Sequence, residues 1–247
     1  IVIAQDITRY GMDWDGKPHL ADLLEELCKL DFHWIRLHYL YPEWIDDRLI
    51  DVIAREDKIL KYLDIPLQHC NDKILKKMNR RGDKKYLCAL LDKLRERIPG
   101  LVLRTSIIAG LPGEGEEEFD ELCDFLREQK LLRAGVFPYS PEEGTRAAKM
   151  ERVDSDEAAR RAERIVDIQS EIIDAWNDER QGDVMEVLCE GFDGQSMLFF
   201  GRSYAESPDI DGRIYFSAPR DVAAGEFVPV RITGAMDGEL TGELAEE

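Results

Sequence analysis

The sequence predicts an α/β protein in two parts, a partial parallel (β/α) barrel followed by a small antiparallel β-barrel. In the first part, apolar runs of strand length alternate with segments of helical periodicity, which is typical of a parallel sheet covered by helices. The last 67 residues instead show short alternating strands separated by glycines. A chain of 247 residues is long enough for two domains. We place these domains at residues 1–180 and 181–247.

The first part holds five expected strands and the helices between them. The strands are expected at residues 1–5, 34–39, 60–66, 101–109 and 133–139, and the helices at 19–31, 46–56, 71–78, 83–98 and 115–130. In a barrel of this kind the chemistry lies on the loops that follow the carboxyl ends of the strands. Those loops read AQD, YLYP, PLQHC, GLPGE and FPYSPEEGT. Because the chain begins inside a strand-like run, we expect its native beginning to be missing and at least one strand to lie upstream.

The second part begins after a long helix that links it to the first. Asp154, Ser155 and Asp156 form a good helix start, and apolar residues then recur at helical spacing until a stop near Gly182. We assign this linker helix to the first domain. The strands of the second domain are expected in the segments VMEVLCE, SMLFFGRS, GRIYFS, GEFVPVRIT and LTGEL.

Composition and charge exclude several classes of protein. Hydrophobic residues make up 44% of the chain and charged residues 34%, which excludes wholesale disorder. No apolar run approaches the roughly 18 residues of a membrane-spanning helix, so we expect no membrane partner. Five cysteines without a CxxC indicate reduced thiols in a cytoplasm. The net charge of −19 repels nucleic-acid phosphates unless a local basic patch prevails, and a basic protein partner is easier to accommodate.

Two strand ends carry residues that suit a ligand or a turn. The glycines of GLPGE, residues 110–114, allow a ligand close to the backbone, although a tight turn before a helix explains them as well. In PLQHC, neither zinc nor a cysteine nucleophile is favoured, because His69 has no partner at ligand spacing. Gln68 and His69 are instead expected to be hydrogen-bonding groups at the barrel mouth. The cysteines at 28, 88 and 123 lie among leucines and are expected in the core.

Three basic features leave open what they bind. Arg104 lies inside an otherwise apolar strand, where its guanidinium needs either a structural ion pair or a bound carboxylate or phosphate. Arg36 poses the same question. The cluster RRGDKK at 80–85 is interpreted as a solvated link between helices, with contact to an anion as the alternative.

Read together, the strand ends resemble the radical S-adenosylmethionine (SAM) methylthiotransferases. The resemblance rests on AQDITRYG, WIRLHYLYP, YLDIPLQHCNDKILKKMNRRG, LRTSIIAGLPGEGEEEF and GVFPYSPEEGTRAA, which match the family in order and spacing. GRSYAESPDIDGRIYF and the strands after it resemble the family's C-terminal TRAM domain. Among these enzymes, the chain is most similar to those that methylthiolate an aspartate of small-subunit ribosomal protein twelve. The first part would then be a radical SAM barrel that is incomplete at its N-terminus.

The resemblance also implies cofactors and contacts. Members of the family bind SAM and two [4Fe–4S] clusters, one of which reduces SAM to a radical that abstracts hydrogen from the substrate. By their positions in the motifs, eleven residues are expected to lie around SAM. They are Gln5, Asp6, Gln68, His69, Arg104, Gly110, Pro112, Gly113, Phe137, Tyr139 and Ser140. Arg104 would bind the methionine carboxylate of SAM, Gln5 and Asp6 would lie next to its amino group, and Phe137 would lie near its adenine.

One departure from the family is large. The CxxxCxxC motif that holds the radical cluster is absent, and so are the three cysteines of the family's N-terminal domain. In the family the radical motif precedes the IVIAQD strand, so we expect the cluster cysteines upstream of Ile1. No metal ligand is assigned within the chain, and these 247 residues alone are expected neither to hold a cluster nor to cleave SAM.

Charge separates the expected partner from its rivals. Residues 181–247 carry fourteen acidic and four basic side chains and no lysine, so they are poorly suited to neutralise tRNA phosphates. The same field would attract a strongly basic ribosomal protein. We therefore expect this domain to dock small-subunit ribosomal protein twelve. A tRNA methylthiotransferase of the same family, a cluster-free protein-binding module and an ordinary metal-free (β/α) barrel enzyme remain the alternatives.

Overall fold

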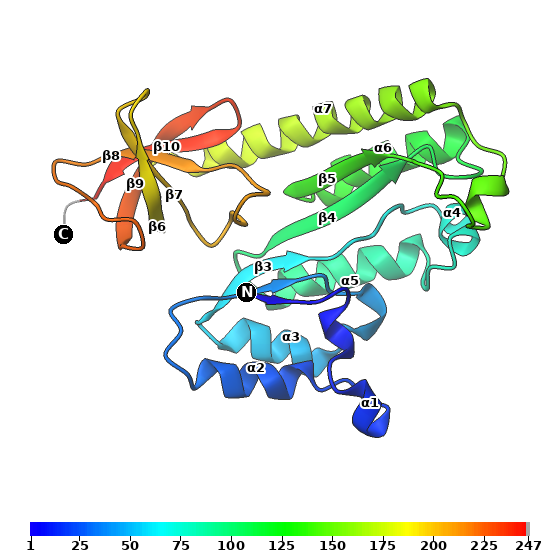
Figure 1. The fold of residues 1–247 in the computed structure, drawn as a ribbon, viewed down its shortest axis with the longest axis horizontal. Helices are drawn as coiled ribbons and strands as arrows, with labels where there is room; N and C mark the ends of the chain where they lie inside the picture. The colour runs from blue at the N-terminus through cyan, green and yellow to red at the C-terminus, as the bar shows by residue number, and fades with distance from the viewer. Residues whose placement is uncertain (246–247) are drawn as a thin grey trace. The chain divides into compact units, whose positions relative to one another are not determined.

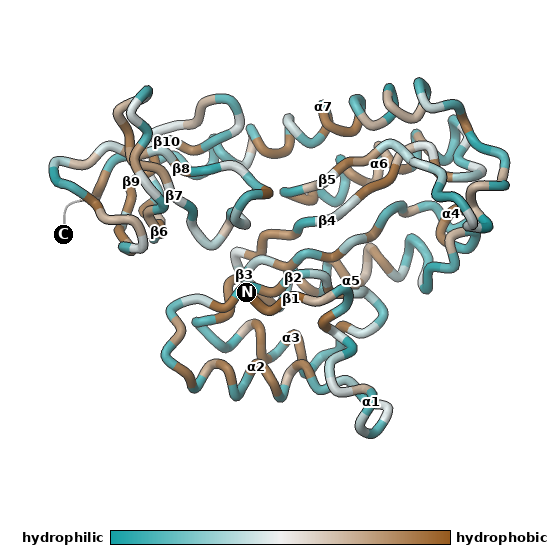
Figure 2. Tube along the Cα trace, viewed as in Figure 1, coloured by the Kyte–Doolittle hydropathy of each residue, from teal (hydrophilic) through white to brown (hydrophobic). Residues whose placement is uncertain are grey.

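The computed structural model describes residues 1–245 and divides into two compact units, Ile1–Gln169 and Ser170–Glu247. The first unit is built on a five-stranded sheet in the order β1-β2-β3-β4-β5, and every neighbouring pair is parallel. Its strands are β1 (Val2–Ile3), β2 (Ile35–His38), β3 (Ile59–Asp64), β4 (Val102–Ala109) and β5 (Arg133–Pro138). The predicted parallel sheet is therefore confirmed. Figure 2 shows β1–β3 largely in the hydrophobic colours.

Helices connect consecutive strands, and α2, α3 and α5 lie along one side of the sheet (Figure 1). The helices of the first unit are α1 (Met12–Asp15), α2 (Leu20–Cys28), α3 (Asp47–Arg55), α4 (Asp72–Lys77), α5 (Lys84–Arg97) and α6 (Glu116–Gln129). Short 3-10 turns cover Ile7–Arg9, Pro42–Trp44 and Ala147–Lys149. The starts of α3, α4 and α5 are fixed by Asp46, Asn71 and Asp83, whose side chains accept backbone N–H groups of the first turn.

Two strands end two residues before their apolar runs do. The run at 1–5 forms only the two-residue β1, which pairs on one side alone. β3 ends at Asp64 instead of residue 66, because Pro66 has no N–H to donate to a ladder. Pairing resumes beyond it as a single bridge between Gln68 and Ile107. The segment that carries Gln68 and His69 is therefore held against β4 without being a regular strand.

The second unit contains a closed barrel in the order β10-β8-β7-β6-β9. Its strands are β6 (Val184–Asp193), β7 (Leu198–Arg202), β8 (Ile214–Ser217), β9 (Phe227–Met236) and β10 (Glu239–Leu244). The predicted barrel is confirmed, but it is not wholly antiparallel, because β10 pairs with β8 in parallel. A ring of five strands cannot alternate direction all the way round, so at least one neighbouring pair must be parallel.

The long helix α7 covers Ser155–Glu179, and Asp154 accepts the Glu157 N–H at its start, 2.8 Å away. The two compact units divide within α7, whereas our sequence boundary lies at its end. No helix in residues 1–245 is both long and apolar enough to cross a membrane. The five cysteines are free thiols: Cys123 lies in the core as predicted, but Cys28 and Cys88 are only half-buried.

Candidate functional site

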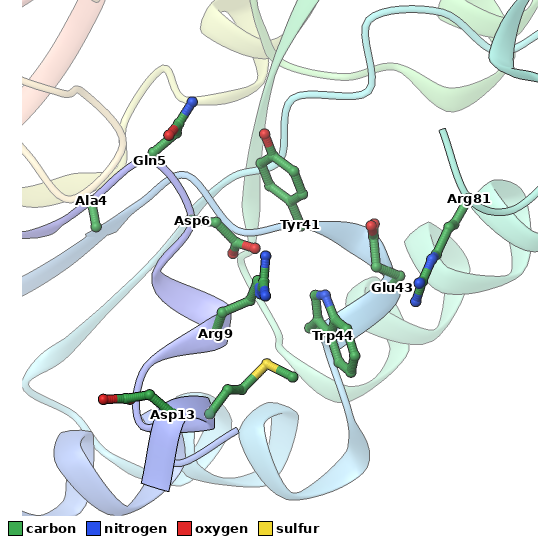
Figure 3. A pocket seen from close by; sticks show the side chains of 10 residues that line it. Ala4, Gln5, Asp6, Arg9, Asp13, Tyr41, Glu43, Trp44 and Arg81 are labelled. Atoms are coloured by element: carbon green, nitrogen blue, oxygen red, sulfur yellow. The ribbon is translucent and has the colours of Figure 1, made fainter. Parts of the chain in front are cut away.

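A pocket of about 740 Å³ lies at the carboxyl ends of β1 and β2, and we call it the strand-end pocket. Its walls are Ala4, Gln5, Asp6, Arg9, Met12, Asp13, Tyr41, Glu43, Trp44 and Arg81. Figure 3 shows these side chains, which come from the segments after β1 and β2 and from Arg81 beyond α4. Gln5 and Asp6, both predicted to lie beside a cofactor, are thus brought together in one pocket of a size typical for small ligands.

The two carboxylate oxygens of Asp6 differ in their hydrogen bonding. Its Oδ1 accepts the Thr8 N–H at 3.0 Å and the Thr8 hydroxyl, which caps the 3-10 turn Ile7–Arg9. Its Oδ2 is buried without a hydrogen-bond partner among the described residues. A buried carboxylate oxygen of this kind is costly unless a donor reaches it. An ammonium group entering the strand-end pocket would supply that donor.

Gln68 is joined to this pocket through Arg80. The Arg80 Nε donates to Gln68 Oε1 at 3.0 Å and its Nη2 to the Pro66 carbonyl at 3.3 Å, while the guanidinium lies 5.0 Å from the Tyr41 ring centroid. Gln68 itself adopts a left-handed backbone conformation, with φ of 68°. Arg80 therefore links the segment after β3 to the segment after β2. Tyr41, which contacts Arg80, is one of the residues that line the strand-end pocket.

Sequence reasoning missed the role of this arginine pair. The sequence predicts that RRGDKK is a solvated link, yet Arg81 lines the strand-end pocket and its guanidinium lies 5.8 Å from the Trp44 ring centroid. Tyr41, Trp44 and Arg9 were also not singled out. The available signal was the aromatic spacing of YLYPEW after β2, because arginine guanidinium groups commonly stack on aromatic faces.

His69 and the GLPGE turn form a buried network, and none of its residues lines this pocket. Glu114 accepts the Gly110 N–H and the Arg161 Nη1–H, both at 2.9 Å. Its other oxygen lies 3.3 Å from His69 Nε2. Because His69 Nδ1 accepts the Asn71 N–H at 2.9 Å, a neutral ring carries its proton on Nε2, toward Glu114. His69 is 1% exposed and lines neither pocket, and its predicted place beside SAM stays a prediction.

The electrostatic balance at Glu114 favours the carboxylate. Burial alone would raise its pKa, but the nearby His69 ring and the hydrogen bonds from Arg161 and the Gly110 backbone outweigh burial and hold the pKa below its usual range. Arg161 also donates to the carbonyls of Glu114 and Gly115. Glu114, which was not among the predicted site residues, thus locks the turn to helix α7.

The glycines of the turn have separate reasons to be glycine. Gly110 has a φ of 81°, and a Cβ there would stand 2.6 Å from the Ala158 Cβ on α7. Gly113 has a φ of 83°, and the Lys77 ammonium lies directly against it. Pro112 and Gly113 line a second pocket, whose lining residues include no residue of the strand-end pocket. Their predicted place beside the same cofactor as Gln5 stays a prediction.

Arg104 is engaged by another protein side chain. Its Nη1 donates to Asp64 Oδ2 at 2.8 Å, and both residues are buried. His38 Nδ1 lies 3.6 Å from the same oxygen. The structural ion pair left open by the sequence is therefore present, and Arg36 packs its guanidinium 4.5 Å from the Tyr62 ring centroid. Binding of a SAM carboxylate by Arg104 stays a prediction.

The end of β5 carries the remaining predicted residues. Phe137 is 54% exposed, Tyr139 is half-buried and Ser140 is exposed. The Tyr139 N–H donates to the Ala109 carbonyl at 2.8 Å, so this segment lies beside the end of β4. None of the three residues lines either pocket. Ten of the eleven predicted residues thus lie at or beyond the carboxyl ends of their strands, whereas Arg104 lies near the start of β4, and neither pocket gathers all of them.

Among residues 1–245, no group of three or more histidine, cysteine or acidic side chains is placed to hold a metal ion. Burial raises the pKa of the Cys70 thiol far above its ordinary value, which makes it a poor ligand or nucleophile. The described residues therefore do not fit an iron–sulfur cluster. They do fit part of a SAM site, since the strand-end pocket offers the partnerless Asp6 Oδ2 beside Gln5 and two aromatic rings.

Comparison with protein families assigns both units. Residues 8–126 match the radical SAM superfamily model, and residues 182–245 match the TRAM domain model. The chain therefore carries a radical SAM domain followed by a TRAM domain. The structure of coproporphyrinogen III oxidase (HemN) from Escherichia coli, described as a radical SAM enzyme, covers 64% of this chain at a TM-score of 0.51, with 39% of that chain matched. At 21% identity this likeness concerns the fold alone.

Two curated relatives match essentially the whole chain and are named for one particular activity. A protein of Symbiobacterium thermophilum named ribosomal protein uS12 methylthiotransferase RimO is 46% identical over 100% of this chain and 52% of its own length. A RimO of Pelotomaculum thermopropionicum is 48% identical over 98% of this chain and 55% of its own. The chain thus spans about half the length of the curated relatives it matches. The resemblance to the radical SAM methylthiotransferases is confirmed.

Proposed function

We propose that this chain is the SAM-binding and substrate-docking part of a radical SAM methylthiotransferase, which modifies the β-carbon of an aspartate in small-subunit ribosomal protein uS12. The observation that carries the proposal is the 43–48% identity, over essentially the whole chain, to proteins named for that activity. Since the proposed substrate is a ribosomal protein, the enzyme would act in the cytoplasm.

Within this proposal, the chain's own residues bind and orient SAM. Asp6 Oδ2 would accept a hydrogen from the methionine amino group, and Gln5 would lie alongside. Arg80 would hold Gln68 in its left-handed conformation, and Tyr41 would form the adjoining wall. A [4Fe–4S] cluster would supply the electron that cleaves SAM. Two such clusters are proposed for the full enzyme, with their cysteines outside these 247 residues.

The activity is tested with a longer protein that includes the residues preceding this chain in its relatives. After anaerobic cluster reconstitution, we expect uS12 to gain the mass of one methylthio group on an aspartate, in a reaction that requires SAM. We expect no such product on tRNA. Modification of tRNA together with unmodified uS12 would reject the proposed substrate in favour of the tRNA methylthiotransferase. The 247-residue chain assayed alone is expected to release no 5′-deoxyadenosine.

The charges of the second unit support a protein substrate. Arg202 pairs with Glu190 and Arg220 with Glu226, at 2.8 and 2.7 Å. Arg213 stacks 4.5 Å from the Phe200 ring centroid, and Arg231 donates to the Gly182 carbonyl. Two of these four arginines are thus neutralised by acids, and Arg213 and Arg231 are the only cations left for phosphates among residues 181–245. Exposed acids such as Asp209, Asp221 and Asp237 would attract a basic partner.

We therefore expect uS12 to bind the chain in a salt-dependent way. Between about 50 and 300 mM salt, the dissociation constant of the complex between uS12 and the chain should rise by about tenfold or more, because screening weakens attraction between exposed charges. tRNA should bind barely or not at all. The measurement is fluorescence anisotropy with labelled uS12 and labelled tRNA across a salt series.

Two variants that each remove three negative charges test whether uS12 binds the second unit specifically or responds only to the net charge of the chain. The triple variant Asp209→Asn/Asp221→Asn/Asp237→Asn should weaken uS12 binding. The control Asp31→Asn/Glu96→Gln/Glu128→Gln removes three exposed negative charges from the first unit and should change binding less than twofold. Equal losses in both triples, uS12 binding indifferent to salt, or tight tRNA binding would each contradict docking by the acidic domain.

A further inference from the structure

A second pocket, of about 660 Å³, lies beside the GLPGE turn, and we call it the turn pocket. It belongs wholly to the first unit. Its walls are Lys77 at the end of α4, the turn and helix start Pro112–Gly115, and the segment Arg146 with Met150–Val153 before α7. Its volume is within the range of small-molecule sites.

The charges around the turn pocket are opposite to those of the chain as a whole. Lys77, Arg146 and Arg152 line it, whereas the acidic residues in its wall are Glu114 and Glu151. The Glu114 side chain is fully buried and neutralised by Arg161, so it contributes no free negative charge. The pocket therefore carries a formal charge of about +2 within a chain of net charge −19.

None of the three cations is paired with an acidic side chain among the described residues. The side chains of Lys77 and Arg146 form no hydrogen bond or ion pair with another described residue. Arg152 donates only through its Nη1, to the carbonyls of Ala148 and Met150 at 3.1 and 3.5 Å. Its remaining guanidinium hydrogens are free to donate to a ligand. Keeping three such cations together has an electrostatic cost that a bound anion would relieve.

The walls are fixed by backbone contacts. Gly113 donates its N–H to the Glu151 carbonyl at 3.2 Å, which ties the turn to the segment that carries Arg152. Gly113 and Gly115 have no side chains to fill the space, and Pro112, Met150 and Val153 supply apolar surface. The pocket is thus a formed cavity with donors on its rim.

We propose that the turn pocket binds the doubly charged phosphate group of a small phosphorylated molecule. Two guanidinium groups offer the paired donors that match phosphate oxygens, and Lys77 adds a third cation. A dianion balances the charge of the pocket, whereas the singly charged phosphodiester of a nucleic acid leaves it half-neutralised. This site is separate from the strand-end pocket and independent of the proposed methylthiolation.

The test is isothermal titration calorimetry of the purified chain with inorganic phosphate at pH 8. We expect one saturable site per chain. Arg146→Ala/Arg152→Ala should weaken binding by about tenfold or more, the loss expected when charged hydrogen bonds are removed. Both side chains are exposed, so the variant should keep its circular dichroism spectrum and melting temperature.

The control is Lys149→Ala, which removes an exposed cation from the same segment outside the pocket, and it should change the affinity less than twofold. The dinucleotide UpU, which carries one phosphodiester, should bind at least tenfold more weakly than phosphate. The proposal is overturned by the absence of saturable phosphate binding, by equal losses in Lys149→Ala and the double variant, or by UpU binding as tightly as phosphate. The last result would assign the pocket to a nucleic-acid backbone.

Discussion

Replacing Glu114 with alanine is expected to lower the free energy of unfolding by about 3–5 kcal/mol, the usual cost of removing one partner from a buried ion pair. The variant removes the buried one of three carboxylates that pair with the Arg161 guanidinium, at 2.9 Å, and leaves the more exposed Glu157 and Glu116 at 2.8 and 3.4 Å. It also leaves the Gly110 N–H without its acceptor and His69 Nε2 without the carboxylate it faces. The measurement is urea unfolding at pH 7.

The matched control is Glu117→Ala, an exposed acid in the first turn of α6. It loses only an interaction with the helix dipole, so its effect should stay below about 1 kcal/mol. Equal losses in both variants would mean that Glu114 contributes only as a residue at the helix start, and that the turn is not locked through Arg161.

The Glu114→Gln variant gives the same network a pH signature. The folded pKa of Glu114 lies below its ordinary value of 4.5. Stability from the ionised carboxylate is therefore fully present above the ordinary pKa and is lost as the pH falls through the lower, folded pKa. The difference in unfolding free energy between wild type and Glu114→Gln should be largest near pH 7 and shrink below about pH 4.5. A difference that stays constant across this range would exclude the ionised form as the source of the stability.

The buried pair Asp64–Arg104 is expected to give an effect of similar size. Arg104→Met leaves the Asp64 carboxylate, which is 0% exposed, without its 2.8 Å partner, and Asp64→Leu leaves Arg104 without its anion. Each single variant should lose about 3–5 kcal/mol. The double variant replaces the pair with apolar side chains of similar volume, so it should lose much less than the sum of the single losses.

The control for this cycle is Arg127→Met, which removes an exposed arginine from its 3.4 Å contact with Asp124 and should cost less than about 1 kcal/mol. The same variants separate two roles of Arg104. A large loss of melting temperature without any cofactor indicates the structural pair, whereas an unchanged melting temperature with weaker SAM binding indicates the predicted cofactor contact. Additive single losses in the cycle would contradict a coupled pair.

The arrangement of elements was largely predictable, because local signals specify it. The alternation of apolar runs and helical periodicity predicted all five parallel strands, and the acidic or amide side chains at 46, 71, 83 and 154 act as helix caps within their own segments. The closed barrel was also predicted, since short alternating strands between glycines favour closure. Its parallel pair was not predicted, because that depends on how the ring closes.

The site was predictable only in part. Gln5 and Asp6 share the strand-end pocket because they follow a strand end, as the barrel rule requires. The same rule brought out Gly110, Pro112 and Gly113 but could not show that Pro112 and Gly113 line a different pocket. Arg80 and Arg81 reach Tyr41 and Trp44 across about forty residues of sequence, a distance over which periodicity carries no information.

The sequence by itself determined the presence of two units, the order of their strands and of helices α2–α7, and the resemblance to radical SAM methylthiotransferases. The tertiary structure decided which buried charges meet. Asp64 lies opposite Arg104 because β3 and β4 pair in that register, and Glu114 meets Arg161 because α7 packs against the GLPGE turn at Gly110. The physical reason is that hydrophobic periodicity specifies which face of an element is buried. The partner of a polar group on that face depends on register and packing between segments forty or more residues apart.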